Sequence, residues 1–396
     1  MKIAMMVRGY IPVPRPADIV YAPIDLAVAI SQGLIKRGHH VDFYAPVGSQ
    51  LKNVPIKSCD LRPLAQNYPE FQGLLNSVDL LTHYIPGLWD QYLSSAMFSR
   101  ANQGGYDLLH FHHPETAMPL AKLFPKVPVV YTLHDPIYGW YHEMFHLYQS
   151  PNQLYISISD NQRRSAPELP YIATAYNGID MSLFPFSDQH DNYLLFVGRI
   201  VPDKGAKEAI EIAKATNHKL LIIGPTYQDK RSYFDDYIEP ELNDQIIYLG
   251  YIDHDKLAPY YARAKALISP IQWEEPFGLT MIEAMACGTP VITYRRGSAP
   301  EIVTDGKTGF VVKNKREMIS AVKKIETISR RACRRRVETK FSLETMIDSY
   351  ERAFSQIIAL RKGKKLIRPF PKLQKQLWRT PRVVPQLIPK RPQANK

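Results

Sequence analysis

Two glutamates eight positions apart, Glu275 and Glu283, are the residues in this sequence whose type and spacing best suit chemistry. They lie in the segment 273–292, WEEPFGLTMIEAMACGTPVI, where a Pro-Phe-Gly turn separates them. A short apolar run with small residues follows the second glutamate, which is typical of a helix packed into a core. The segment therefore predicts carboxylates on both sides of a turn that opens a helix.

Two interpretations of Glu283 stay open. The pattern Thr-x-x-Glu fits a capping box with Thr280 as the N-cap, and the helix would end near Gly288. In the second interpretation the uncapped N–H groups of the same helix hold a phosphate, with Gly278 allowing close approach of the backbone. Glu283 would then accept the hydroxyls of a ribose and Glu275 would face the group beyond the phosphates. This spacing fits a nucleoside diphosphate sugar.

A second candidate site is the loop 198–205, GRIVPDKG, which follows an apolar run and opens another helical pattern. Arg199 and Lys204 could neutralise a pyrophosphate, the arginine as a bidentate fork and the lysine as a point charge. The alternative is a pair of solvated surface bases. The sequence has neither a Walker loop nor G-x-G-x-x-G, which argues against a nicotinamide cofactor.

Other charged or histidine-rich motifs are weaker candidates. Asp253-His254-Asp255 is formally a D-x-D metal motif, but its place before a helical pattern favours an aspartate that caps the helix. In LLHFHH, His110 and His112 share one face of the expected strand while His113 points away. We therefore expect no metal site, and we expect these histidines to lie near a cleft between domains.

The elements that must position these residues alternate between apolar runs and amphipathic stretches, which is typical of parallel α/β folds. In the first half we expect strands at 2–7, 40–45, 108–113, 129–134 and 154–159, with a helix at 23–36. The alternation restarts after a linker-like stretch at 180–192, with strands at 193–198, 219–224, 245–250, 265–270, 290–294 and 309–312. Further helices are expected from about 206, from about 256 and at 343–361. Two such halves imply a cleft beyond the carboxyl ends of the strands.

The composition is that of an ordinary globular protein, with two domains expected for 396 residues. The three cysteines have no metal-ligand spacing and suggest a reducing compartment. The sequence has no apolar run long enough to span a bilayer or to form a signal peptide. We therefore expect a cytoplasmic protein. The net charge of +12 comes entirely from the tail 361–396, which holds 12 Lys and Arg and no acid. We consider two interpretations of this tail: a solvated disordered segment, or a segment that contacts the inner face of an anionic membrane. Nucleic acid is not an expected partner.

GRIVPDKG together with EEPFGLTMIEAMACGTPVI resembles the donor half of retaining glycosyltransferases of the family-four type, also called group 1, which have the GT-B fold. Supporting matches are Asn177-Gly178-Ile179-Asp180, Gly250-Tyr251-Ile252, the segment 298–309 and Tyr131-Thr132-Leu133-His134-Asp135. The resemblance covers about residues 1–358. It implies an acceptor-side domain at 1–182, a donor domain at 183–342, a helix at 343–360 that crosses back to the first domain, and the basic tail at 361–396.

The resemblance also assigns roles to individual residues. It implies hexosyl transfer from a UDP- or GDP-hexose to a glycan, a lipid or a small molecule, with retention of configuration and without metal or cofactor. The implied catalytic residues are His134 beside the sugar, Arg199 and Lys204 on the pyrophosphate, and Glu275 on the sugar hydroxyls. The implied donor contacts are Gly198, Ile252, Phe277, Gly278, Leu279, Thr280 and Glu283.

The first loop departs from the family pattern, which often has a glycine pair there. This chain reads GYIPVPRPADIVYAP and has Gly9 alone. Arg15, Asp18 or the nearby His112 are the residues that could contact an acceptor instead. The rival hypotheses are a catalytically silent sugar-nucleotide or glycan binder and a different reaction on the same fold, such as an epimerase or a phosphorylase. Nothing in the sequence identifies a lysine for the pyridoxal phosphate that a phosphorylase would use.

Overall fold

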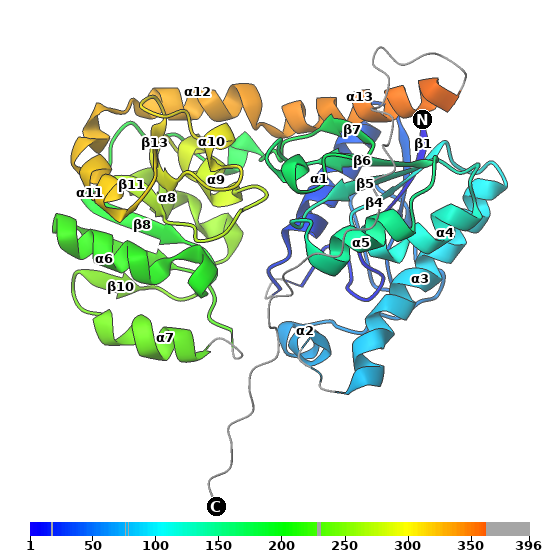
Figure 1. Ribbon diagram of the computed structural model, residues 1–396, viewed down its shortest axis with the longest axis horizontal. Coiled ribbons are helices and arrows are strands. Elements are labelled where there is room, and N and C mark those ends of the chain that lie inside the picture. The colour runs from blue at the N-terminus through cyan, green and yellow to red at the C-terminus, as the bar shows by residue number, and fades with distance from the viewer. Residues whose placement is uncertain (17–18, 76, 78, 228–230, 362–396) are drawn as a thin grey trace, which may run out of the picture. The chain divides into compact units, whose positions relative to one another are not determined.

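The computed structural model describes residues 1–16, 19–75, 77, 79–227 and 231–361. Its core consists of two all-parallel β-sheets, each with helices on both faces (Figure 1). Most expected strands are present, within one or two residues at their ends, which confirms the α/β interpretation with two Rossmann-like domains. Of the expected basic tail 361–396, only Arg361 lies within the described residues.

The first sheet has the order β3-β2-β1-β4-β5-β6-β7. Its strands are β1 (Lys2–Met6), β2 (His40–Tyr44), β3 (Ile56–Lys57), β4 (Leu108–Phe111), β5 (Val129–Leu133), β6 (Gln153–Ser157) and β7 (Tyr171–Thr174). Alternate residues of β1 enter opposite cores: Ile3 and Met5 on one face, Ala4 and Met6 on the other. Burial on both faces is the reason that strands such as β1 and β5 are nearly continuous apolar runs.

The second sheet has the order β10-β9-β8-β11-β12-β13. Its strands are β8 (Tyr193–Val197), β9 (Lys219–Ile223), β10 (Ile246–Tyr248), β11 (Ala266–Ser269), β12 (Val291–Tyr294) and β13 (Gly309–Val312). In both sheets the strand order reverses at one point, between β1 and β4 and between β8 and β11. Such switch points open a crevice at the carboxyl ends of the strands. Most candidate residues follow these four strands, whereas His134 follows β5 and Ile252 follows β10.

The helices of the first half are α1 (Ala22–Lys36), α2 (Tyr68–Leu75), α3 (Leu80–Asn102), α4 (Met118–Leu123) and α5 (Gly139–Leu147). Those that follow β8 are α6 (Ala206–Thr216), α7 (Arg231–Tyr237), α8 (Ala258–Arg263), α9 (Leu279–Ala286), α10 (Ala299–Ile302), α11 (Lys315–Lys324), α12 (Arg330–Lys340) and α13 (Leu343–Arg361). The helix expected at 23–36 is α1, and the one expected at 343–361 is α13. Helix α3 contains Pro86 and was not expected from the sequence.

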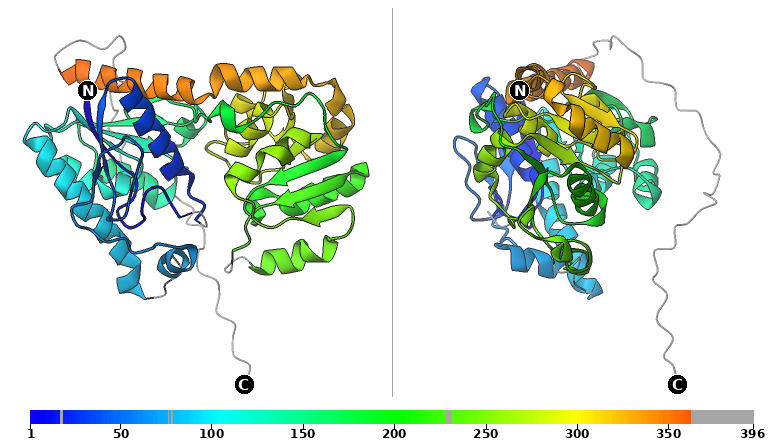
Figure 2. Two further views of the ribbon diagram at one scale, coloured as in Figure 1. Left: turned by 180° about the vertical axis from the view of Figure 1, so that it is seen from behind. Right: turned by 90° about the vertical axis from the view of Figure 1, so that its left-hand side faces the viewer.

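The last helix, α13, packs on the domain that contains the first sheet, and it contacts α1 and β7 there (Figures 1 and 2). Its buried side chains, spaced three or four residues apart, join the core that contains Ile3 and Met5: Met346, Ile347, Tyr350, Ala353, Phe354 and Ile357. A Cβ at Gly33 of α1 would lie 2.1 Å from Cδ1 of Ile347, so a larger residue there would force the Ile347 side chain to move. The expected domain limits at 182 and 342 fall in the connections β7–β8 and α12–α13 and stay an interpretation.

Candidate active site

One cavity of about 710 Å³ collects many of the candidate residues. It is lined from the first half of the chain by Arg15, Tyr21 and Asp25, and from the second half by residues that follow β8, β9, β10 and β11. The expected site residues in its lining are Arg15, Gly198, Arg199, Ile252, Leu279, Thr280 and Glu283. The expected residues outside its lining are Gly9, His112, His134, Lys204, Glu275, Phe277 and Gly278.

The loop after β8 is shaped by close backbone contacts. Gly224 has φ +155°, and a Cβ there would lie 1.8 Å from the carbonyl oxygen of Gly198, so the ends of β8 and β9 can meet only without a side chain. Gly205 has φ +80° and directly precedes α6. Arg199, which lies between Gly198 and Gly205, is exposed, and among the described residues its guanidinium has no hydrogen-bond or ion-pair partner. It is therefore open to an anion in the cavity.

Lys204 and Glu275 form an ion pair, although the sequence analysis assigned them to different parts of a ligand. Nε1 of Trp273 donates to the same Glu275 oxygen over 2.7 Å, and the Lys204 ammonium lies 5.3 Å from the centre of the indole. Both charged side chains are mostly buried, at 19% and 15% exposure. The neighbouring Glu274 has a structural contact instead, because its carboxylate accepts the backbone N–H of Gly297.

The capping-box interpretation of Thr280 and Glu283 is wrong. Helix α9 has Gly278 as its N-cap and no side-chain cap. The Glu283 carboxylate, which is buried, accepts instead from Nε2 of His254 at 2.9 Å and from the Tyr261 hydroxyl at 2.7 Å. Because each of its two oxygens accepts a hydrogen bond from one of these side chains, the Glu283 carboxylate does not turn back to cap the helix. No side chain caps the N–H groups at the start of α9, where Leu279 and Thr280 line the cavity. Such uncapped N–H groups suit the binding of a phosphate.

His254 also lines the cavity, and its hydrogen bond to Glu283 raises its pKa. Asp253 of the D-x-D motif occupies the N-cap position of the short 3-10 helix His254–Lys256, as predicted, but its side chain makes no cap hydrogen bond and instead accepts from Lys256 over 2.8 Å. All three residues of the motif line the cavity, and the middle one, His254, is the one that bonds to the buried Glu283. This role of His254 could not be predicted from a local pattern, because its partner Glu283 lies 29 positions away.

Phe277 is buried against Tyr176 and Phe341, with ring centres 6.3 and 5.9 Å away. Its side chain therefore belongs to the core, and only its backbone remains available to a ligand. Ile252 and Leu279, in contrast, are half-buried and line the cavity. Of the donor residues predicted from the resemblance, these two offer apolar contact area.

The second group of candidates lies where β4 and β5 end. Nδ1 of His112 and Nε2 of His134 are 2.8 Å apart, and the two rings stack with centres 5.1 Å apart. His110 lies beneath them, 4.4 Å from the ring of His112, and bonds to the Thr132 hydroxyl at 2.8 Å. Burial lowers the pKa of His110 to about 3 and also lowers the pKa values of His112 and His134. This histidine cluster (His110, His112 and His134) is therefore neutral at pH 7.

His113 points to the other side, as expected, and joins a cluster that sequence analysis missed. Arg8, directly after β1, contacts Asp90 at 2.9 Å, Glu115 at 2.8 Å and Nδ1 of His113 at 2.8 Å. Although burial opposes it, the Arg8 charge lowers the pKa of the Glu115 carboxyl. The position of Arg8 after the first strand was the one available signal. The two acidic partners of Arg8 stand at positions 90 and 115, and no local sequence pattern predicts that they contact Arg8.

The candidates of the first loop are only partly free. The Gly9 N–H donates to Asp90 at 2.5 Å, so that amide is occupied within the protein. A Cβ at Gly9 would also lie 2.6 Å from the Trp89 carbonyl oxygen, so close packing against α3 explains the glycine. Arg15 lines the cavity and pairs with Asp25 at 2.9 Å. Asp18 lies outside the described residues.

Two family models match this chain, and the boundary between the two matched ranges lies in the connection between β7 and β8. The family model described as Glycosyltransferase Family 4 matches residues 25–183, and the one described as Glycosyl transferases group 1 matches residues 184–339. An uncharacterised 41.2 kDa protein of the Klebsiella pneumoniae cps region is 30% identical over 40% of this chain and 44% of its own length. An uncharacterised glycosyltransferase of Methanocaldococcus jannaschii is 25% identical over 79% of this chain and 85% of its own length. The match thus spans less than half of the first relative.

Solved structures show the same fold at low identity. Sucrose-phosphate synthase from Thermosynechococcus elongatus has a TM-score of 0.69 at 18% identity, over 91% of this chain and all of that one. The Anabaena protein HepE in complex with UDP-glucose has a TM-score of 0.64 at 16% identity, over 90% of this chain and all of that one. No helix within the described ranges combines the length and hydropathy that crossing a membrane requires.

Proposed function

Because the chain belongs to the group 1 glycosyltransferases, we propose that it transfers a hexose from a nucleoside diphosphate sugar to a glycan, lipid or small-molecule acceptor. The observation that carries the proposal is the cavity at the β8–β11 switch point, where an unpaired arginine, an uncapped helix start and a buried carboxylate meet. These three features suit a pyrophosphate and a ribose. The UDP-glucose complex of the Anabaena neighbour supports a donor of this class.

The donor would lie across the start of α9. Its pyrophosphate is held by Arg199 and the N–H groups of Leu279 and Thr280, and its ribose hydroxyls by Glu283. Glu283 already accepts two hydrogen bonds, but each carboxylate oxygen has a further lone pair for a hydroxyl. His254 fixes this carboxylate in position. Ile252 supplies apolar contact beside the base.

The transferred sugar would lie on the Glu275 side of the turn. There the ion pair with Lys204 opens or is shared, so that the lysine contacts the leaving phosphate while Glu275 accepts sugar hydroxyls. Negative charge develops on the departing diphosphate, and Arg199, Lys204 and the start of α9 can stabilise it. We propose that this set of charges makes a metal unnecessary.

Retention of configuration is proposed through front-face attack. In that reaction the acceptor hydroxyl passes its proton to a leaving phosphate oxygen, so no protein base is required. Neutral His134, bonded to His112, can donate to or accept from a sugar hydroxyl without adding charge. Arg15, which lines the cavity, and His112, which bonds to His134, are the proposed acceptor-side contacts.

The proposal is tested by incubating the chain with UDP-glucose, UDP-N-acetylglucosamine and GDP-mannose and following release of the nucleoside diphosphate, with and without EDTA. Arg199→Ala should lower turnover about 100-fold, as loss of a charge that stabilises a transition state does. Arg335→Ala, an exposed arginine of α12, is the matched control and should keep wild-type turnover. Tight donor binding without turnover over a broad acceptor panel would favour the silent binder.

A further inference from the structure

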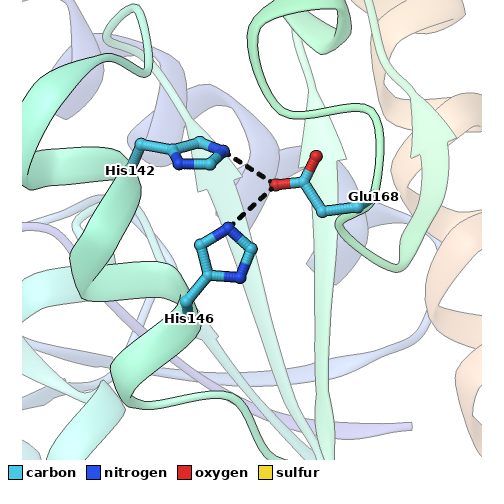
Figure 3. Close-up of side chains that lie close together, drawn as sticks. All are labelled: His142, His146 and Glu168. Carbon is cyan, nitrogen blue, oxygen red and sulfur yellow. Dashed lines mark hydrogen bonds and ion pairs between the residues drawn. The ribbon is translucent and has the colours of Figure 1, made fainter. Parts of the chain in front are cut away.

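A cluster of two histidines and a glutamate lies away from the cavity described above. His142 and His146 are four residues apart on α5, and Glu168 belongs to the connection between β6 and β7. Nε2 of His142 lies 2.8 Å and Nε2 of His146 lies 3.4 Å from the same oxygen of Glu168 (Figure 3). Figure 3 shows both rings directed at the carboxylate from the same side of the helix. None of the three lines the donor cavity.

The geometry matches what a tetrahedral metal ion requires. A tetrahedral Zn²⁺ with ligands at about 2.0–2.1 Å separates neighbouring ligand atoms by about 3.3 Å. The ligand atoms of His142, His146 and Glu168 all lie within 4.8 Å of one another, and the two histidine–glutamate distances of 2.8 and 3.4 Å lie on either side of about 3.3 Å. Among the residues that the structure describes, this is the one group of three with such convergence. Histidines at i and i+4 present their nitrogens on one helix face, as zinc sites on helices do.

The backbone on both sides of the cluster is held in place. Phe145, between the two histidines, is fully buried and fixes the rotation of α5. Ala166 and Leu169 flank Glu168 and are buried in the same apolar core as Phe145. The side chains themselves are 29–39% exposed, so an ion can reach them from solvent. The three ligands are therefore arranged before any ion binds, which lowers the cost of binding.

We propose that His142, His146 and Glu168 bind one Zn²⁺ ion, with water in the fourth position. The site joins α5 to the β6–β7 connection, whose only regular element is the short turn Gln162–Ser165. Helix α5 begins five residues after His134, so the ion also fixes the segment that follows the histidine cluster. The role is structural and departs from the expectation that the chain holds no metal.

The test is calorimetric titration of ZnCl₂ into the full chain without an affinity tag, after EDTA treatment and desalting. The wild type should bind one ion, and zinc should raise its melting temperature. His146→Ala and Glu168→Gln should each weaken zinc binding at least ~10-fold. The glutamine keeps a hydrogen-bond acceptor for the histidines, so it separates loss of a metal ligand from loss of the ion pair. Co²⁺ should give visible absorption bands in the wild type and not in His146→Ala.

His190→Ala is the matched control, because His190 pairs with Glu326 at 3.2 Å but has no second histidine beside it. It should keep wild-type zinc affinity. The proposal is overturned if the wild type binds no zinc below millimolar concentration, or if His146→Ala and His190→Ala bind it equally well. Turnover of His146→Ala with nucleotide sugars should equal that of the wild type, so this result is independent of the proposed transferase activity.

Discussion

Replacing His110 with phenylalanine should make the protein less sensitive to acid. His110 is fully buried, and its Nε2 bonds to Thr132 Oγ1, which itself donates to the Tyr350 hydroxyl. Nε2 must then carry the proton, and Nδ1 has no acceptor among the described residues. A second proton on Nδ1 would have no partner, and burial accordingly lowers the pKa of His110 to about 3.

The magnitude follows from proton linkage. In the unfolded chain the pKa of histidine is about 6.5, so below that pH the unfolded state takes up a proton that folded His110 refuses. The stability that this group contributes is present above pH 6.5 and is lost as the pH falls toward 3. Between pH 7 and pH 5, a shift from about 6.5 to about 3 removes about 2 kcal/mol. His110→Phe should abolish that loss, and because the His110 charge also lowers the pKa values of His112 and His134, their acid sensitivity should fall as well.

The measurement is urea unfolding at pH 7, 6 and 5, followed by fluorescence and circular dichroism. The control is Phe354→Leu, since Phe354 packs 5.2 Å from the His110 ring but does not titrate. That variant should be destabilised on the order of 1 kcal/mol equally at each pH. The reasoning is refuted if the wild type and His110→Phe lose the same stability from pH 7 to pH 5, within about 0.5 kcal/mol.

Three further outcomes are expected in the donor site. Glu283→Gln should weaken donor binding about 5- to 30-fold in calorimetry, because a neutral acceptor makes hydrogen bonds about 1–2 kcal/mol weaker; unchanged affinity would exclude the ribose contact. The raised pKa of His254 contributes stability that is fully present below pH 6.5 and lost as the pH rises through the folded pKa, so thermal unfolding of Glu283→Gln should lack this loss above pH 6.5. Lys204→Ala should reduce turnover about 100- to 1,000-fold with a smaller effect on donor affinity, and a change in affinity alone would contradict its role on the leaving group.

The strands and the ends where ligands bind were predictable from the sequence because burial on both faces of a parallel sheet leaves continuous apolar runs. Because ligands bind beyond the carboxyl ends of parallel strands, the sequence also predicted a ligand site at Arg199 and at the start of α9, and both line the cavity. What failed were side-chain contacts between distant positions. Glu283 was weighed as a cap because Thr280 is three residues before it, whereas its partners stand 22 and 29 positions away.

The pair of Lys204 and Glu275 and the cluster around Arg8 were missed for the same reason. The two members of the pair are 71 positions apart, and Arg8 is 82 positions from Asp90. Asp90 comes from α3, a long helix that contains a proline and did not show a helical pattern. The zinc ligands had a local signal in the spacing of His142 and His146, but Glu168 becomes their neighbour only through the β6–β7 connection.

Helix α13 has a consequence for the order in which the protein folds during synthesis. The hydroxyls of Thr132 and Tyr350, 218 positions apart, meet inside the first domain. The ribosome must therefore complete the second domain before the first can bury the core on the α1 side of its sheet, whereas the core on the other side contains no described residue of α13. Until then the α13-facing side of α1 and the His110 ring lack their cover, so the early chain is exposed to aggregation and to chaperones. A fragment that ends near residue 182 would keep that exposed face permanently, and a gene encoding the first domain alone would need the α13 segment appended to it.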